Sequence, residues 1–229
     1  MKIQEKTVFI LVEPAVAGNI GAAARAIKTM GFQHLWLVSP KVNHRCEEAK
    51  MLAHGSQDIL DRAKTFETLE HALETVDLAI GTTAKKRTSK QEYYACHQLK
   101  NILLDKLSML NKVAIVFGRE ESGLTNQELL ICDIASTIPL YTTYPSLNLG
   151  QAVMLYAYEL GQFYQNVSVQ AGDENKLMIV KEKASRILNS LAIDKNPNLY
   201  HRIFERLAIM GADDMNLLLS VLEKWQKRT

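Results

Sequence analysis

The stretch KVAIVFGREESGL, residues 112–124, joins an apolar run to a charged loop. Its first half, residues 112–117, has the length and the continuous apolar character of a strand that is buried on both faces of a sheet. Its second half holds an arginine and two glutamates between two glycines. Ionised side chains beside a buried strand are costly unless they are paired. The loop therefore predicts either a structural Arg–Glu pair or a substrate site.

The same strand pattern recurs along the first part of the chain. Short apolar runs typical of buried strands occupy residues 7–12, 34–39, 78–81 and 135–138. Between them lie segments of helical periodicity, at residues 20–27, 47–54, 69–75 and 149–165. Buried strands that alternate with helices predict an α/β fold, in which a mostly parallel sheet is flanked by helices.

The organisation changes after residue 165. Residues 166–175 are polar and unpatterned, which predicts a linker. Residues 176–229 return to helical periodicity, interrupted at residues 196–198 by Asn-Pro-Asn. We therefore predict an α/β domain over residues 1–165 and a small all-helical C-terminal extension of about three helices over residues 176–229.

The composition is that of a globular protein, with 229 residues of which 47% are hydrophobic and 23% are charged. The apolar runs are too short to span a bilayer, and Glu13 and Pro14 interrupt the first one before a signal-peptide core is complete. The cysteines and histidines are dispersed, which argues against a disulfide framework and against a metal site. These features predict a cytoplasmic protein with no metal and no membrane anchor.

The net charge of +2 is only mildly basic, but cations cluster locally. Lys85, Lys86, Arg87 and Lys90 place four cations within six residues. An isolated run of this kind is typical of a solvated loop. Beside a nucleic-acid site, the same run predicts phosphate contacts.

Polar residues and glycines collect where the predicted strands end, which is where parallel sheets bind ligands. Residues 13–25, EPAVAGNIGAAAR, follow the first strand. Asn19 suits the N-cap of the next helix, and Arg25 falls off the apolar face of that helix. The pattern fits a capped helix with a solvent arginine, and it also fits a phosphate-binding helix start. No GxGxxG or GxxxxGK[ST] spacing occurs, so a dinucleotide or P-loop fingerprint is not supported.

Two further strand ends share this feature. Residues 81–84, Gly-Thr-Thr-Ala, form a turn of small residues that leaves room for a ligand. In residues 145–151, PSLNLGQ, Asn148 and Gln151 have the spacing of a capping box. Capping gives no role to the three preceding residues, Pro145, Ser146 and Leu147.

Three of these segments resemble, in this order, the motifs of one enzyme family. They are NIGAAARAIKTMGF (residues 19–32), VFGREESGL (residues 116–124) and IPLYTTYPSLNLGQAV (residues 138–153). Together they are similar to the TrmH/SpoU branch of the SPOUT class of RNA methyltransferases. Within that branch the sequence resembles the tRNA ribose methyltransferase J and LasT-like group, and the resemblance covers residues 7–165.

The resemblance implies a sheet whose C-terminal part is tied into a trefoil knot, a rare exception to un-knotted chains. It also implies S-adenosylmethionine bound among the knot loops and a homodimer that completes the site. The positions that match the cofactor pocket are Thr82, Thr83, Ala84, Gly118, Ile138, Pro145, Ser146 and Leu147. The positions that match catalytic motifs are Asn19, Arg25, Glu120, Ser146 and Asn148.

The implied reaction transfers a methyl group to a ribose 2′-hydroxyl of RNA, most readily in the anticodon loop of tRNA. Because a guanidinium keeps its proton at neutral pH, we expect Arg25 to bind an RNA phosphate and steer the hydroxyl. We expect Glu120 to fix Asn19 or Arg25. Ribosomal RNA and a non-catalytic, knotted RNA-binding module remain the alternatives. With RNA as substrate, the expected contacts are Arg25, Lys85, Lys86, Arg87 and Lys90.

Overall fold

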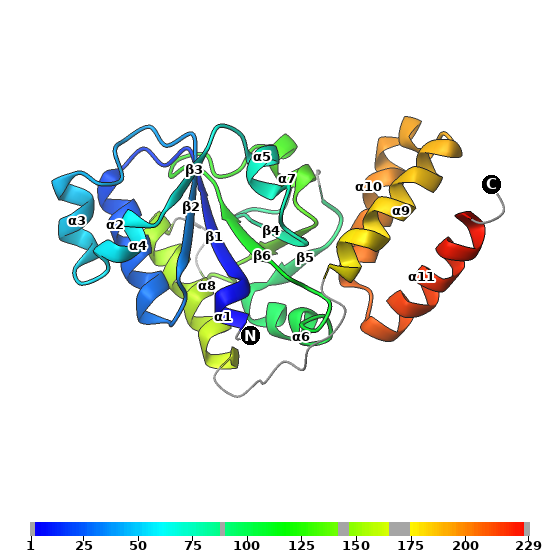
Figure 1. Cartoon of the computed structure of the whole chain (residues 1–229). Coiled ribbons are helices and arrows are strands. Elements are labelled where there is room, and N and C mark those ends of the chain that lie inside the picture. The colour runs from blue at the N-terminus through cyan, green and yellow to red at the C-terminus, as the bar shows by residue number, and fades with distance from the viewer. Residues whose placement is uncertain (1–2, 88–89, 142–146, 165–174, 227–229) are drawn as a thin grey trace.

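A computed structural model of the chain describes residues 3–87, 90–141, 147–164 and 175–226 (Figure 1). In these residues, seven strands form one sheet in the order β3-β2-β1-β6-β4-β7-β5, and every pairing is parallel. The strands are β1 (Thr7–Val12), β2 (His34–Val38), β3 (Lys64–Phe66), β4 (Leu78–Thr82), β5 (Tyr93–Ala95), β6 (Val113–Phe117) and β7 (Ile134–Thr137). The predicted parallel α/β fold is confirmed.

The centre of the sheet explains why the sequence shows continuous apolar runs. β1 and β6 pair in register, with Phe9 opposite Ile115, and both strands are buried along their whole length. Successive side chains of a strand point to opposite faces, so a strand covered on both faces is apolar at every position. The predicted bounds of β1 match the structure, those of β2, β4 and β6 differ by one residue at one end, and those of β7 differ by one residue at both ends.

Helices cover both faces of the sheet (Figure 1). Phe9, Leu37 and Phe117 point to one face, which packs against helices that precede and follow the central strands. These helices are α2 (Ala17–Thr29), α3 (Glu47–Ala53), α4 (Gln57–Asp61), α6 (Leu99–Leu104) and α8 (Leu149–Tyr164). Ile10 and Val116 point to the other face, which packs against α5 (Leu69–Leu73) and α7 (Asn126–Ile131). The short helix α1 (Ile3–Lys6) leads into β1.

The C-terminal extension consists of α9 (Lys176–Ser190), α10 (Pro197–Ile209) and α11 (Ala212–Gln226), with a 3₁₀ turn η2 (Ile193–Lys195) after α9. Figure 1 shows these helices grouped beside the half of the sheet that ends in β5. Ion pairs attach them to that half: Lys181 Nζ lies 2.6 Å from Asp133 Oδ1, and Arg202 Nη2 lies 2.9 Å from Glu92 Oε1. The expected helices are confirmed, while the division into domains stays a prediction. Apart from Asn175, the predicted linker lies outside the described residues.

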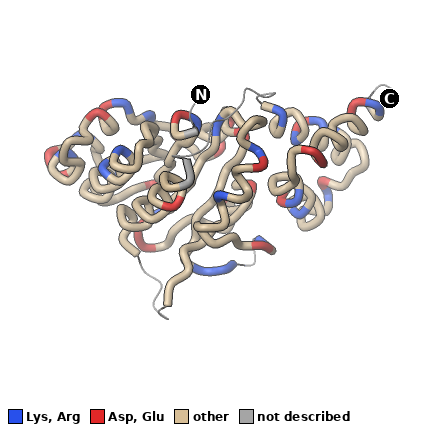
Figure 2. The backbone as a smooth tube through the Cα atoms, turned by 90° about the horizontal axis from the view of Figure 1, so that it is seen from below, with Lys and Arg blue, Asp and Glu red and all other residues tan. Residues whose placement is uncertain are grey.

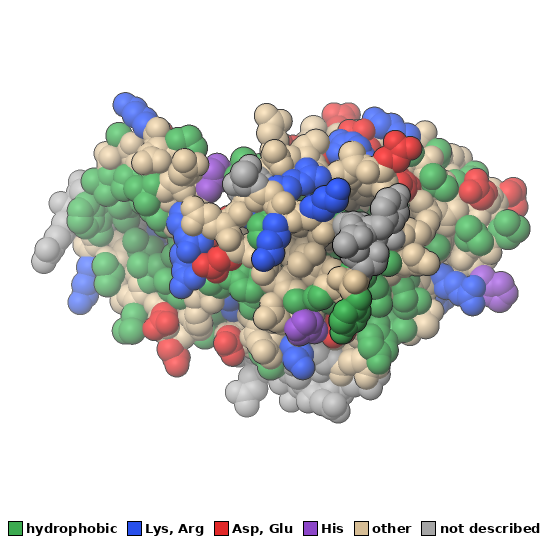
Figure 3. Space-filling model, turned by 180° about the vertical axis from the view of Figure 1, so that it is seen from behind, with side chains coloured by type: hydrophobic (Ala, Val, Ile, Leu, Met, Phe, Trp, Pro, Cys, Tyr) green, Lys and Arg blue, Asp and Glu red, His purple; other side chains and the backbone are tan. Residues whose placement is uncertain are grey.

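One side of the extension is apolar and open. On α11, Leu217, Val221 and Trp225 are exposed, whereas Met215 and Leu222 make the packing contacts. Figure 3 shows hydrophobic side chains gathered over the extension when the molecule is viewed from behind. Among the helices of the described segments, none is long and apolar enough to cross a membrane.

The fold differs in several features from the sequence-based expectation, which did not include the short helices α1, α4, α6 and α7. The edge strands β3 and β5 have three residues each and were not expected. Helix α2 begins at Ala17 after Val16, so Asn19 lies in the first turn and is not the N-cap. The trefoil knot stays a prediction, because part of the segment that would form it, residues 142–146, is outside the described residues.

Candidate active site

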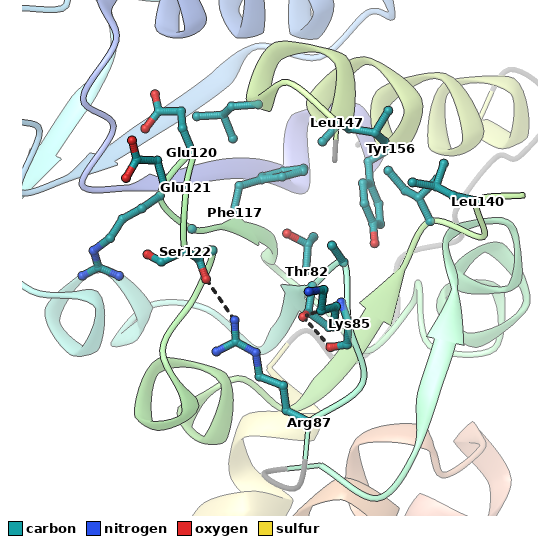
Figure 4. Close-up of a pocket in the computed structure, with 18 residues that line it drawn as sticks. Thr82, Lys85, Arg87, Phe117, Glu120, Glu121, Ser122, Leu140, Leu147 and Tyr156 are labelled. Carbon is teal, nitrogen blue, oxygen red and sulfur yellow. Dashed lines mark hydrogen bonds between the residues drawn. The ribbon is translucent and has the colours of Figure 1, made fainter. Parts of the chain in front are cut away.

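A pocket of about 440 Å³ opens at the carboxyl ends of β4, β6 and β7 (Figure 4). Its walls come from the segments that follow these strands and from the start of α8. Six residues predicted to contact the cofactor line it: Thr82, Thr83, Ala84, Gly118, Ile138 and Leu147. The other two, Pro145 and Ser146, lie outside the described residues.

The pocket also has an apolar wall, whose residues were not among the predicted cofactor contacts. Phe117, Leu140, Leu149 and Tyr156 line it, and Figure 4 shows Phe117 and Tyr156 directed into the cavity. The Tyr156 hydroxyl donates a hydrogen bond of 2.9 Å to Ser136 Oγ. Burial raises the pKa of Tyr156, so this hydroxyl stays protonated. Tyr156 follows the helical spacing of α8, which is the only signal that could have placed it on the inner face.

Two glycines shape the loop after β6. A Cβ atom on Gly118 would lie 2.0 Å from the carbonyl carbon of Gly123 and from the nitrogen of Leu124. Gly123 has a φ of 68°, in the left-handed region that glycine adopts without strain. Arg119 and Gly123 exchange backbone hydrogen bonds across the loop. The loop is therefore a tight turn that only glycine permits at these two positions.

The contacts of Arg119 support the first alternative predicted for this loop, a structural Arg–Glu pair. Its guanidinium lies 2.9 Å from Glu13 Oε1 and 3.0 Å from Glu128 Oε2. These hydrogen bonds hold the pKa of Glu13 below its usual range; for Glu128 they outweigh burial, which acts in the opposite direction. Arg119 is therefore a structural pairing residue, and its partners are glutamates from other segments of the chain.

Glu120 has a different role, because it supplies the negative charge at the start of α2. The amides of Ala15 and Val16 each donate to its carboxylate at 3.2 Å, and Asn19 Nδ2 donates at 3.1 Å. Partial burial acts to raise the pKa of Glu120, but these hydrogen bonds outweigh it and hold the pKa below its usual value. An anion at a helix N-terminus is stabilised by the helix dipole. Glu120 thus fixes the two residues that precede α2 from a loop about a hundred residues away, while the first-turn amide of Gly18 donates to Glu48 Oε1 at 3.1 Å.

Asn148 extends this hydrogen-bonded chain. Its Nδ2 donates to Asn19 Oδ1 at 2.7 Å, and its Oδ1 accepts from the amide of Gly150 at 2.8 Å. Its own amide donates to Gln151 Oε1 at 3.1 Å, which confirms the predicted capping pair. Glu120, Asn19 and Asn148 therefore form one continuous chain of hydrogen bonds that joins the three sequence motifs.

Arg25 lies apart from this chain. It is exposed on α2 and does not line the pocket. One turn earlier, Ala22 packs against Gly150 at the start of α8, which places Arg25 beside the α2–α8 contact. Within the segments that the structure describes, Arg25 has no hydrogen bond or ion pair, so its side chain is open to a partner molecule.

The predicted RNA contacts divide into two groups. Lys85 and Lys86 are exposed, in the basic run that Figure 2 shows as a blue stretch at the edge of the domain. Lys90 differs from the expectation: it is 6% exposed, donates to the carbonyl of Cys132 at 2.7 Å and lies 3.4 Å from Glu205 Oε1 on α10. A buried ammonium with these partners is not placed to contact a phosphate. Arg87 is half-buried, and its guanidinium binds the carbonyls of Ser122 and Leu124.

No group of three or more His, Cys, Asp or Glu side chains within the described segments is arranged to hold a metal ion. The site combines a pocket with one apolar wall, small and charged loop residues, and a hydrogen-bonded amide chain at the carboxyl edge of a parallel sheet. The chain belongs to the SpoU rRNA Methylase family, whose sequence profile matches residues 6–158. This membership confirms the class indicated by the three motifs, an RNA methyltransferase.

Individual relatives resemble the chain over almost its whole length. It is 42% identical over 222 residues to the uncharacterized tRNA/rRNA methyltransferase LasT of Escherichia coli, covering 96% of both chains. It is 34% identical over 238 residues to tRNA (cytidine/uridine-2′-O-)-methyltransferase TrmJ of Photorhabdus laumondii, covering 96% of this chain and 98% of that protein. The crystal structure of TrmJ from Z. mobilis superposes with a TM-score of 0.68 at 26% identity, covering 96% and 99% of the two chains.

Proposed function

We propose that this protein transfers a methyl group from S-adenosylmethionine to a ribose 2′-hydroxyl of tRNA. The observation that carries the proposal is the convergence of the three motifs on one edge of the sheet. There, the Glu120–Asn19–Asn148 chain lies next to the pocket that Leu147 and Gly118 line. The names of the relatives support RNA as the substrate and the 2′-oxygen as the acceptor.

The pocket fits a cofactor of this kind. A volume of about 440 Å³ is within the usual range for small-ligand sites, about 300–1,000 Å³. Phe117 and Leu140 offer an apolar surface for a flat base, and Thr82 and Thr83 offer small polar groups opposite. When bound, S-adenosylmethionine supplies a methyl group that its sulfonium already activates.

The hydrogen bonds of the amide chain limit what its members do chemically. Asn19 uses Nδ2 toward Glu120 and Oδ1 toward Asn148, so both ends of its amide are occupied. Glu120 accepts three hydrogen bonds, and its pKa lies below the usual value, which makes it a weak base. We therefore assign Glu120, Asn19 and Asn148 to positioning, which is worth up to about 7–11 kcal/mol in ideal alignments.

Arg25 is the residue that contacts the RNA in this proposal. Its guanidinium binds the phosphate next to the target ribose and steers the 2′-hydroxyl toward the methyl group. Because Arg25 stays protonated at neutral pH, the hydroxyl proton passes to an acceptor other than Arg25, and the bound phosphate is the nearest candidate.

A second copy of the chain completes the site. Arg25 does not line the pocket of its own chain. The helical layer around it exposes large apolar side chains on α3 and α8, including Met51 (70% exposed), Leu155 and Tyr158. A homodimer formed through this layer would cover these side chains and bring Arg25 of one copy to the pocket of the other.

The first experiment separates cofactor binding from chemistry. Calorimetry should show that Arg25→Ala binds S-adenosylmethionine as the wild type does, while transfer of labelled methyl groups to tRNA is lost. Methyl transfer by Arg25→Ala near the wild-type rate would contradict the assignment. A wild-type chain that does not bind the cofactor would instead favour the non-catalytic RNA-binding module.

The second experiment tests the shared site. Ala84→Trp fills the cofactor pocket and Arg25→Ala removes the phosphate contact, so each variant alone should be inactive. Mixed dimers of the two contain one intact site if the sites are shared, and part of the activity should return on mixing. No recovery would mean that each copy uses its own Arg25.

Ribosomal RNA is the second candidate substrate, because the LasT relative is named for both RNA classes. Mapping of 2′-O-methyl positions in total RNA from cells with and without the gene decides between them. We also propose a cytoplasmic location, where either RNA substrate is found.

A further inference from the structure

Arg87 connects the two loops that form opposite walls of the pocket. It belongs to the segment after β4, and its guanidinium reaches the loop after β6. Nη1 donates to the carbonyl of Leu124 at 2.6 Å, and Nη2 donates to the carbonyl of Ser122 at 2.9 Å. Figure 4 shows the side chain extending from its own loop to Ser122.

The backbone of Arg87 is fixed as well. Its amide donates to the Tyr93 hydroxyl at 2.7 Å, and the same hydroxyl donates to the Arg87 carbonyl at 2.7 Å. Tyr93 begins the edge strand β5 and pairs with Ala135 of β7. The loop after β4, the loop after β6 and strand β5 are therefore joined through one residue.

We propose that Arg87 is a positioning residue for cofactor binding, which holds the two walls of the pocket at the separation that the cofactor needs. This inference rests on the proposed function. Two loops that are already joined lose less conformational freedom when the ligand binds, and preorganisation of this kind raises affinity. Without the two hydrogen bonds that Arg87 donates to the loop after β6, the cofactor itself would have to order both loops.

The chemistry of the side chain explains why an arginine occupies this position. A guanidinium presents its donors in a rigid, planar fork and reaches two carbonyls at once, whereas an ammonium is a compact point charge. Hydrogen bonds from an ionised donor are also stronger than those between two neutral groups. The guanidinium is committed to these carbonyls, so Arg87 acts on the pocket and leaves phosphate contact to Lys85 and Lys86.

The test is calorimetric titration of the full-length protein with S-adenosylmethionine. Arg87→Gln should weaken binding at least about tenfold, the effect expected from losing one charge-assisted hydrogen bond. Arg87→Lys keeps the charge but not the fork, and it should lose most of the same affinity. Lys86→Gln is the matched control, since it removes the neighbouring cation and should leave the cofactor Kd unchanged.

Kinetics separate positioning from a general structural defect. At saturating cofactor the kcat of Arg87→Gln should approach that of the wild type, while its KM for the cofactor rises. An unchanged KM with a lower kcat would overturn the inference, and so would wild-type affinity in either Arg87→Gln or Arg87→Lys.

A second variant keeps the inference testable if Arg87→Gln does not fold. Tyr93→Phe removes only the hydroxyl that anchors the Arg87 backbone, and it should raise the cofactor Kd in the same direction by a smaller factor. An unchanged Kd in this variant would overturn the inference that Arg87 positions the two loops. A wild-type chain that fails to bind the cofactor contradicts the proposed function itself, which is a separate result from normal binding by the Arg87 variants.

Discussion

Asn148 donates a hydrogen bond from Nδ2 to Oδ1 of Asn19, at 2.7 Å and across 129 positions of the chain. It joins the first turn of α2 to the residue that precedes α8. Since Asn148 also accepts from the Gly150 amide, one side chain both caps α8 and fixes its position against α2.

Asn148→Asp separates these two roles. Aspartate still caps α8 through its carboxylate, but it has no donor for Asn19 Oδ1. Turning the Asn19 amide to donate to the new carboxylate would direct its oxygen at Glu120 instead. We expect a loss of about 1–3 kcal/mol in the free energy of unfolding and a large loss of methyl transfer, measured by urea denaturation and an activity assay.

Asn196→Asp is the matched control for this substitution. Asn196 caps α10 by accepting from the Leu199 amide at 3.3 Å, and its side chain makes no other hydrogen bond within the described segments. Its exchange should change the free energy of unfolding by less than about 0.5 kcal/mol. Equal effects of the two substitutions would show that the Asn148–Asn19 bond contributes nothing.

Glu120→Gln should destabilise the protein in a pH-dependent way. The pKa of Glu120 lies below its ordinary value of 4.5, so its stabilising charge is fully present above about pH 4.5 and is lost as the pH falls through the lower, folded-state value. We expect a difference of about 1 kcal/mol from the wild type at pH 7 that shrinks in acid, measured by urea unfolding at several pH values. Glu121→Gln, at the exposed neighbour, is the control and should change the free energy of unfolding at pH 7 by less than about 0.5 kcal/mol. A pH-independent difference for Glu120→Gln would rule out the charge at the start of α2 as its cause.

Gly118→Ala should distort the loop after β6. The added methyl group would meet the backbone of Gly123 and Leu124, which cannot move aside as a side chain can. We expect a loss of at least about 2 kcal/mol in the free energy of unfolding, together with weaker cofactor binding. Gly211→Ala is the control, because a Cβ atom there meets nothing within 4 Å. Similar thermal stability of both variants would contradict the tight turn.

Lys85 and Lys86 should control the salt dependence of RNA binding. Their exposed ammonium groups lie directly after the pocket loop, where a bound RNA passes in the proposed function. Replacing both by alanine should reduce the slope of log K against log salt by roughly 0.7–0.9 for each RNA phosphate that the two lysines neutralise. Filter binding over a range of salt concentrations measures this slope, and an unchanged slope would remove both residues from the interface.

Lys90→Ala should lower the stability of the protein and leave the salt dependence of RNA binding unchanged. It would leave Glu205 without the nearby ammonium and the Cys132 carbonyl without its hydrogen bond, inside the contact between α10 and the sheet. Removing one partner of a buried pair is strongly destabilising, and we expect a loss of about 2 kcal/mol or more in chemical denaturation. Stability equal to that of Lys86→Ala would contradict the buried placement of Lys90.

The central part of the fold was predictable because its strands carry a simple signal. β6 is apolar at every position and β1 at every position after Thr7, and α8 has helical spacing and a capping pair. β3 and β5 were missed because three-residue edge strands such as Lys64–Phe66 are partly exposed and show no continuous apolar run. Local sequence therefore identifies buried elements better than edges.

The site was predictable in its motifs but not in its pairings. Asn19 has the side chain of an N-cap, yet the amides at the start of α2 donate to Glu120 and Glu48. Arg87 and Lys90 belong to one basic run, yet one joins two loops and the other is buried under α10. These partners lie from about 35 to more than 100 positions away in the chain, a separation at which local pattern carries no information.

The hydrogen bonds from the residues in front of α2 to Glu120 have a consequence for how the chain folds. The amides of Ala15 and Val16 receive their carboxylate from a residue more than a hundred positions later. Contacts that close such long loops form late and slow the folding of a domain. During synthesis, the first long helix emerges well before the loop that fixes the two residues in front of it. The N-terminal end of α2 therefore reaches its final position only after the loop that follows β6 has been made.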